Sequence, residues 1–103
     1  GTDFIAVPTT DVAYFFTEHK MVFLVDTHGK KFIVDKPLGE LDTVLDKQNF
    51  FRLNRKYIAR ITAIVKFKSH EKGKVKVDLQ PGTPEEVIVS QENAAAFKAW
   101  MGK

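Results

Sequence analysis

The side chains of this sequence that are most able to do chemistry are basic, and they are concentrated in one segment. Residues 51–77 carry nine Lys or Arg and one acid, a net charge of +8, whereas the remainder of the chain carries −5. The densest part combines a lysine and three arginines with apolar residues that favour strands: Arg52, Arg55, Lys56 and Arg60. A charge asymmetry of this size predicts a polyanionic partner.

The basic residues fall into two groups. Lys66, Lys68, Lys74 and Lys76 occupy outward positions of two expected strands joined by a loop at residues 69–73. Like charges across a strand pair are unfavourable, so these lysines indicate either a partner or a sheet edge that they protect from pairing. The arginines lie in and beside a segment expected to be irregular, and a planar guanidinium can clamp phosphate or contact guanine.

Groups suited to catalysis or metal binding are sparse. The three histidines, His19, His28 and His70, fall in separate loops or loop edges, and the chain has no cysteine. It has no Gly-rich phosphate loop, and Ser90 lacks the glycines of a nucleophile elbow. We therefore expect no enzymatic activity, no metal site and no cofactor, and we assign the Ser90 hydroxyl to capping a C-terminal helix.

Length and composition suit one folded domain. With 103 residues, 44% of them hydrophobic, the chain can form a single core. No apolar run approaches the length of about eighteen residues that a membrane-spanning helix needs. The lack of cysteine is compatible with a reducing cytoplasm. Because a strand pattern begins almost at the first residue, we expect residues 1–103 to be a single domain excised from a longer protein.

The hydrophobic pattern predicts a mainly β fold. The expected strands are residues 4–8, 11–17, 21–25, 31–34, 50–53, 61–68, 74–79 and 87–89. Residues 54–59 are expected to be irregular. Leucines spaced three and four apart predict a short amphipathic helix near residues 38–46, and a second apolar stripe predicts a C-terminal helix near residues 91–101.

Alternation within the strands predicts which side chains form the core. The strand at 11–17 carries aromatic residues at both alternating sets of positions, so we expect both of its faces to be buried. In the strand at 61–68, Val65 and Phe67 are expected to face inward while Lys66 and Lys68 face outward.

Residues 51–61, followed by Ile64, resemble the hallmark segment of LytTR-type DNA-binding domains, which has the pattern Phe-x-Arg-x-His-Arg-Ser-Tyr-Ile-Val-Asn and then an isoleucine. Other segments resemble the family in the same order along the chain: Asp11–Phe15, Leu38–Leu41 with Leu45, Val87–Ser90 and Phe97–Trp100. The resemblance therefore covers nearly the whole sequence.

Four positions depart from the family pattern. Asn54 stands where His is usual, Lys56 where Ser is usual, and Arg60 where Asn is usual. Gln91 replaces the Arg that follows Ser90. These changes bear on the preferred DNA sequence more than on the fold, since Gln can pair with adenine and the other three retain basic or hydrogen-bonding character.

The resemblance implies a mainly β domain of antiparallel sheets that binds double-stranded DNA sequence-specifically, through loops in the major groove. It also implies the output domain of a cytoplasmic bacterial two-component response regulator of transcription, located after a receiver domain. The DNA-binding residues that we expect by position, with Arg55 the strongest candidate for a base contact, are the following: His19, Lys20, Arg52, Asn54, Arg55, Lys56, Tyr57, Arg60, Ser90 and Gln91.

Two further expectations concern partners. We expect the isolated domain to be a monomer that prefers paired direct-repeat sites, because adjacent copies gain effective concentration. The alternative function is a protein-interaction or ligand-sensing β domain whose basic face docks onto an acidic protein surface. Dependence of duplex binding on salt distinguishes the two, because neutralised phosphates release counterions.

Overall fold

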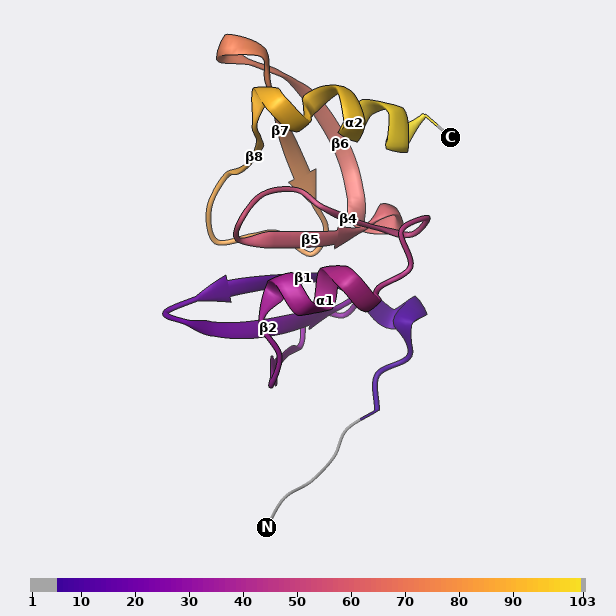
Figure 1. Ribbon diagram of the computed structural model, residues 1–103. Helices are drawn as coiled ribbons and strands as arrows, with labels where there is room; N and C mark the ends of the chain where they lie inside the picture. The colour runs from indigo at the N-terminus through magenta and orange to yellow at the C-terminus, as the bar shows by residue number, and fades with distance from the viewer. Residues whose placement is uncertain (1–5, 103) are drawn as a thin grey trace.

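The computed structural model describes residues 6–102, which form two antiparallel sheets and two α-helices. Figure 1 shows the five-stranded sheet and α1 (Leu38–Val44) in the lower part of the view. The three-stranded sheet and α2 (Gln91–Met101) are in the upper part. The predicted mainly β class and both predicted helices are confirmed. No helix within residues 6–102 is long and apolar enough to cross a membrane.

The larger sheet has the strand order β3-β2-β1-β5-β4. Its strands are β1 (Val12–Glu18), β2 (Met21–Asp26), β3 (Lys31–Val34), β4 (Phe50–Arg52) and β5 (Tyr57–Arg60). The first five residues of β1 are all buried, because β1 lies inside the sheet with apolar layers on both faces. Tyr14 and Phe16 join one core, and Phe15 packs in the other with Leu38 and Leu41 of α1. The predicted burial of both faces is therefore confirmed.

The smaller sheet has the order β6-β7-β8, with β6 at Ile64–His70, β7 at Lys74–Leu79 and β8 at Val87–Val89. The inward residues of β7 and β8 are buried together with Phe97 and Trp100 of α2. The same core includes Tyr14 and Phe16 of the larger sheet, so one apolar cluster joins the two sheets.

The expectation of an irregular segment over residues 54–59 is wrong for most of its length. Residues 57–60 form β5, which pairs with β1 on one side and β4 on the other. Tyr57, Ile58 and Ala59 are each 1% exposed or less, so burial between two neighbouring strands overrides the polar composition of the segment. Within that segment the irregular backbone is confined to residues 54–56, and Leu53, expected to end the preceding strand, also lies outside β4.

Two strand predictions also require correction. The expected strand at residues 4–8 lies partly outside the described residues, and its described part, 6–8, is not in a strand. Residues 61–63 form a 3₁₀ turn, so the next strand begins at Ile64. Because a register shift follows Ile64, which lies opposite the buried Leu79, Val65 is displaced from the core and is 63% exposed.

Candidate nucleic-acid interface

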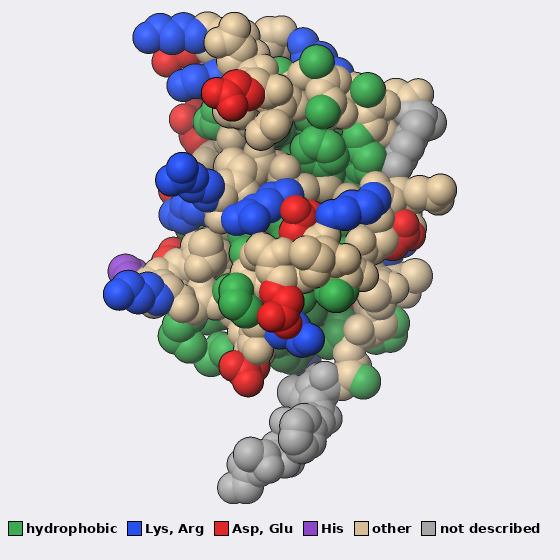
Figure 2. Space-filling model, viewed as in Figure 1, with side chains coloured by type: hydrophobic (Ala, Val, Ile, Leu, Met, Phe, Trp, Pro, Cys, Tyr) green, Lys and Arg blue, Asp and Glu red, His purple; other side chains and the backbone are tan. Residues whose placement is uncertain are grey.

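Three segments that carry predicted site residues lie along the same side of the molecule (Figure 1). The β1–β2 turn adjoins the β4–β5 turn, because the Thr17 amide donates a hydrogen bond to the Lys56 carbonyl oxygen at 3.0 Å. The β4–β5 turn in turn contacts β8, since Asn54 Nδ2 donates to the Ile88 carbonyl oxygen at 2.9 Å. These turns and the β8–α2 junction all lie toward the left of Figure 1. Figure 2 shows Lys and Arg side chains along that edge.

The β4–β5 turn is closed by its own side chains. Asn54 Oδ1 accepts hydrogen bonds from the amides of Lys56 (2.8 Å) and Tyr57 (3.0 Å), which is the geometry of an Asx turn. Arg52 supports the turn from β4: its Nε donates to the Asn54 carbonyl oxygen and its Nη2 to that of Arg55, both at 3.2 Å. The backbone of Arg55 is thereby fixed while its side chain remains exposed.

The β1–β2 turn has an uncommon backbone. His19 and Lys20 are both exposed, and their φ angles are +52° and +66°. Two consecutive positive φ values match the two-residue type I′ hairpin turn, which normally contains Asn and Gly. Non-glycine residues in this conformation are strained.

The β8–α2 junction presents Ser90 and Gln91, both exposed. The expectation that the Ser90 hydroxyl caps α2 is wrong: Ser90 is the N-cap residue, but its side chain makes no capping hydrogen bond. Its carbonyl oxygen instead accepts a hydrogen bond from the Asn93 amide at 3.1 Å. Gln91 packs on the β6–β7 loop, where a Cβ atom on Gly73 would lie 3.0 Å from Gln91 Cγ.

A groove of about 540 Å³ separates the β4–β5 turn from the start of α2. Its lining joins both segments to side chains of α1 and β4: Asp42, Phe51, Arg52, Asn54, Arg55, Ser90, Glu92 and Asn93. The groove thus brings together the predicted residues Arg52, Asn54, Arg55 and Ser90, which are up to 38 positions apart in the chain.

Lys56 is engaged within the protein. Its Nζ lies 2.5 Å from Glu85 Oε1, in the loop between β7 and β8. Lys76 forms a similar pair with the neighbouring Glu86, at 3.1 Å. The turn therefore presents Arg55 unpaired with any acid among residues 6–102, while the charge of Lys56 is partly neutralised.

Tyr57 and Arg60 do not belong to the exposed surface of this turn. The Tyr57 side chain is 1% exposed and packs between Tyr14 and Phe16, so its match to the hallmark segment reflects core packing. Burial raises the pKa of Tyr57 to about 12, and the nearby negative charge of Glu85 contributes to the same shift. Arg60 lies about 10 Å along β5 from Tyr57, and its Nη1 donates to the Thr9 carbonyl oxygen at 3.1 Å.

The predicted outward face of the β6–β7 hairpin is confirmed by its register. Lys68 lies directly opposite Lys76, and Lys66 lies opposite Asp78 with an Nζ–Oδ2 distance of 3.9 Å. Lysines 66, 68, 74 and 76 are exposed or half-buried. Lys72, at the tip of this hairpin, has a φ of +58° and is exposed.

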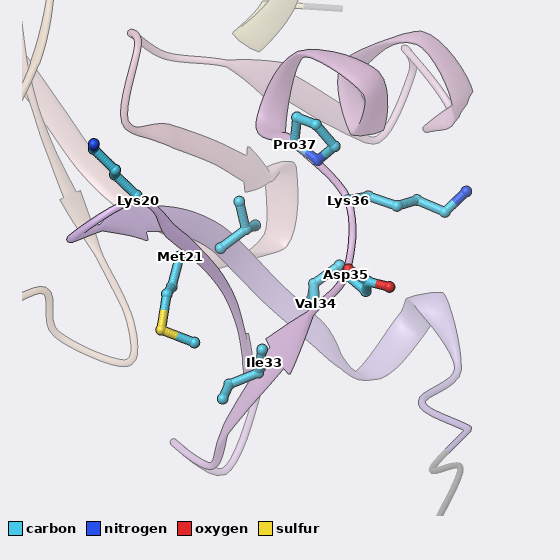
Figure 3. Close-up of a pocket in the computed structure, with 8 residues that line it drawn as sticks. Lys20, Met21, Ile33, Val34, Asp35, Lys36 and Pro37 are labelled. Atoms are coloured by element: carbon cyan, nitrogen blue, oxygen red, sulfur yellow. The ribbon is translucent and has the colours of Figure 1, made fainter. Parts of the chain in front are cut away.

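A second hollow, of about 500 Å³, lies beside the β1–β2 turn between β2, β3 and the start of α1. Figure 3 shows Met21 and Ile33 flanking it, with Lys20 extending from the hairpin in another direction. Its lining has no cluster suited to acid–base chemistry, with Asp35 as the single carboxylate. Over residues 6–102, no three His, Asp or Glu side chains are grouped so as to hold a metal ion.

Several residues of this surface were not predicted from the sequence. Asn93 lines the groove one helical turn after Ser90, so helical spacing offered a signal for it. Glu85 and Glu86 neutralise two lysines, but their ion pairs span 29 and 10 positions and the sequence carries no local signal for them.

Comparison with known proteins agrees with this fold. A family model described as the LytTr DNA-binding domain matches residues 2–102. A search of curated proteins found no match. Among solved structures, a LytTr DNA-binding domain from Bacillus cereus, described as part of a methyl-accepting/DNA response regulator, has a similar fold. Its TM-score is 0.81 at 24% sequence identity, over 96% of this chain and 88% of that one. The chain belongs to the LytTr DNA-binding domain family.

Proposed function

We propose that this domain binds double-stranded DNA sequence-specifically as the output domain of a bacterial transcriptional response regulator. Its turns would enter the major groove. The observation that carries the proposal is that the β1–β2 turn, the β4–β5 turn and the β8–α2 junction lie in contact along one side of the molecule, with Arg55 exposed on a backbone fixed by hydrogen bonds. A fixed backbone with a free guanidinium suits a bidentate contact to guanine.

The proposed roles follow from the hydrogen bonds already made. Arg55 contacts a base, and Gln91 is a second candidate because its amide can pair with adenine. Asn54 and Arg52 are positioning residues, because their polar atoms hold the β4–β5 turn. His19, Lys20, Lys56 and Ser90 are proposed to contact phosphates or base edges at the rim.

The lysines of the β6–β7 hairpin have a different proposed role. They lie on an open sheet face rather than around the groove, so they contribute long-range attraction to phosphates without selecting a sequence. Arg60 belongs with this background charge, since it lies away from the β4–β5 turn.

In the full-length regulator we propose a receiver domain upstream and two domain copies on direct repeats. A monomeric domain would bind one half-site weakly, and a second tethered copy would raise the occupancy through effective concentration. We propose no catalytic activity and no cofactor.

The experiment compares Arg55→Ala with Lys74→Ala on a site selected from a random duplex pool and on random duplex. Arg55→Ala should weaken binding to the selected site by about 1–3 kcal/mol and have little effect on random duplex. Lys74→Ala should weaken both equally and lower the salt slope by about one.

The alternative function, a protein-interaction domain, predicts a different result. A protein-docking domain would bind arbitrary duplex poorly and show no preferred site. Equal losses on both duplexes for Arg55→Ala would refute the base contact. A lower melting temperature with an unchanged specificity ratio would instead give Arg55 a role in the fold.

A further inference from the structure

Two consecutive acids on the loop between β7 and β8 each pair with a lysine of the basic block. Glu85 Oε1 lies 2.5 Å from Lys56 Nζ, and Glu86 Oε2 lies 3.1 Å from Lys76 Nζ. Lys56 belongs to the β4–β5 turn beside Arg55, and Lys76 to the outward face of β7. One short loop therefore neutralises cations on two separate elements.

The loop is held in place by contacts with its surroundings. The Tyr14 hydroxyl donates to the Gly82 carbonyl oxygen at 3.1 Å, and Thr83 Oγ1 donates to the Glu85 carbonyl oxygen at 2.6 Å. Pro81 and Pro84 restrict the backbone on either side. Val87, directly after the two acids, is 1% exposed. The carboxylates are consequently kept near the lysines at a small cost in chain entropy.

The Lys56–Glu85 pair holds a carboxylate against the Lys56 ammonium while leaving both groups accessible to solvent. Its side chains are 45% and 46% exposed, so solvent screens the attraction. The geometry places the carboxylate on the cation that a DNA phosphate beside Arg55 would need. Phosphate and carboxylate cannot both occupy the single ammonium at hydrogen-bond distance without repelling each other.

We propose that Glu85 is an intramolecular competitor of DNA phosphate that masks Lys56 until the domain is bound to its preferred site, and that Glu86 acts in the same way on Lys76. This inference rests on the proposed function. On random duplex, attraction is almost entirely phosphate neutralisation, and a loosely held phosphate leaves the Lys56–Glu85 pair intact. On the preferred site, base contacts bring the turn close enough for phosphate to replace the carboxylate. Glu85 thereby suppresses sequence-independent binding.

The test is Glu85→Gln, an isosteric change, measured against salt on random duplex and on a selected site. On random duplex the free Lys56 should release about one further counterion, steepening the salt slope by about 0.9 and raising affinity about fivefold at physiological salt. On the selected site the slope should stay unchanged and the affinity should rise less. Glu86→Gln should act in the same direction through Lys76.

Glu40→Gln is the matched control. Glu40 also forms an ion pair with a lysine, Lys36, at 3.3 Å, with side chains of similar exposure (53% and 54%), but neither residue belongs to the β4–β5 turn or to the β7–β8 loop. It produces the same change in net charge. A second control introduces Glu85→Gln into Lys56→Gln, where it should add nothing on random duplex. Thermal melts verify that each variant is folded.

Each contrary result overturns the inference in a recognisable way. An equal gain for Glu40→Gln would mean that net charge alone is responsible. A gain that persists in Lys56→Gln would exclude Lys56 as the target. A loss of affinity would mean that Glu85 positions Lys56 for phosphate rather than masking it. If the wild-type domain binds no duplex at any salt concentration, the proposed function fails and the inference fails with it.

Discussion

Asn54 and Ile88 join the two sheets at the candidate interface: Asn54 Nδ2 donates to the Ile88 carbonyl oxygen at 2.9 Å across 34 positions of sequence. The same carboxamide accepts two amides of its own turn through Oδ1. One side chain therefore fixes the shape of the β4–β5 turn and its distance from the β8–α2 junction. Arg55 on one side and Gln91 on the other are held at a set spacing as a result.

Substitutions of Asn54 should separate its role in closing the β4–β5 turn from its hydrogen bond to Ile88. Asn54→Ala removes three hydrogen bonds, each contributing about 1 kcal/mol, and should lower the free energy of unfolding by about 2–3 kcal/mol. Asn54→Asp keeps the acceptor for the two amides but replaces the donor to Ile88 with an oxygen. We expect an intermediate loss for Asn54→Asp in urea unfolding. Asn93→Ala, at an exposed position, is the control. If Asn54→Asp lowers the free energy of unfolding no more than Asn93→Ala does, the hydrogen bond to Ile88 contributes nothing to stability.

Gly73 should control the direction of the Gln91 side chain. Residue 73 has a φ of +76°, and a Cβ atom there would lie 3.0 Å from Gln91 Cγ. Gly73→Ala is therefore expected to displace Gln91 and to change the base preference of selected duplexes, beside a backbone cost of about 1 kcal/mol. Gly29→Ala is the control, because Gly29 has a φ of +88° and open space around it. It should carry the backbone cost without altering selectivity; a similar change in both variants would contradict a role for the Gly73 contact.

Elements with a strong local pattern could be predicted from the sequence. The strand Lys31–Val34 and the helix Gln91–Met101 have the predicted bounds, because apolar periodicity over neighbouring positions is enough to define them. β5 could not be predicted in this way. Its residues follow a run rich in Asn, Arg and Lys, and their strand conformation depends on pairing with β1 and β4.

The same distinction between local sequence pattern and tertiary contacts applies to the candidate site. The basic turn and the junction at Ser90 were predicted from residue types, and the structure brings both segments to one groove. Their connections were not predictable, because the Asn54–Ile88 and Lys56–Glu85 contacts join segments that only tertiary folding places together. The burial of Tyr57 was also missed, since a tyrosine beside arginines has the composition of a contact surface.

Tyr57 should make the fold sensitive to alkaline pH. Its pKa in the folded protein is about 12, whereas its ordinary value is 10.0, so the unfolded chain loses this proton first. The corresponding stability is fully present below pH 10 and is lost as the pH rises through 12, with two pKa units equivalent to about 2.7 kcal/mol. Tyr57→Phe should flatten this loss in unfolding measurements from pH 8 to 12. An unchanged pH profile would contradict the assignment.

The contrast with Tyr14 sharpens that test. The Tyr57 hydroxyl is buried and makes no hydrogen bond to any residue of 6–102, whereas the Tyr14 hydroxyl donates to the Gly82 carbonyl oxygen at 3.1 Å. At pH 7, Tyr14→Phe should cost about 1 kcal/mol, while Tyr57→Phe should be neutral or stabilising. Comparing the two variants separates loss of a hydroxyl from loss of a hydrogen bond.

The β1–β2 turn should exchange stability for binding. His19 and Lys20 both adopt positive φ, a conformation in which Asn and Gly are less strained. His19→Asn combined with Lys20→Gly should raise the free energy of unfolding by about 1–2 kcal/mol. The same double variant should bind duplex DNA more weakly, because it removes a cation and a hydrogen-bonding ring from the interface.

Lys72→Gly provides the comparison, since Lys72 also has a positive φ but lies on the β6–β7 hairpin. It should gain stability while keeping its preference for the selected site over random duplex. Unchanged stability in the double variant would mean that the turn is unstrained, and unchanged affinity would remove it from the interface.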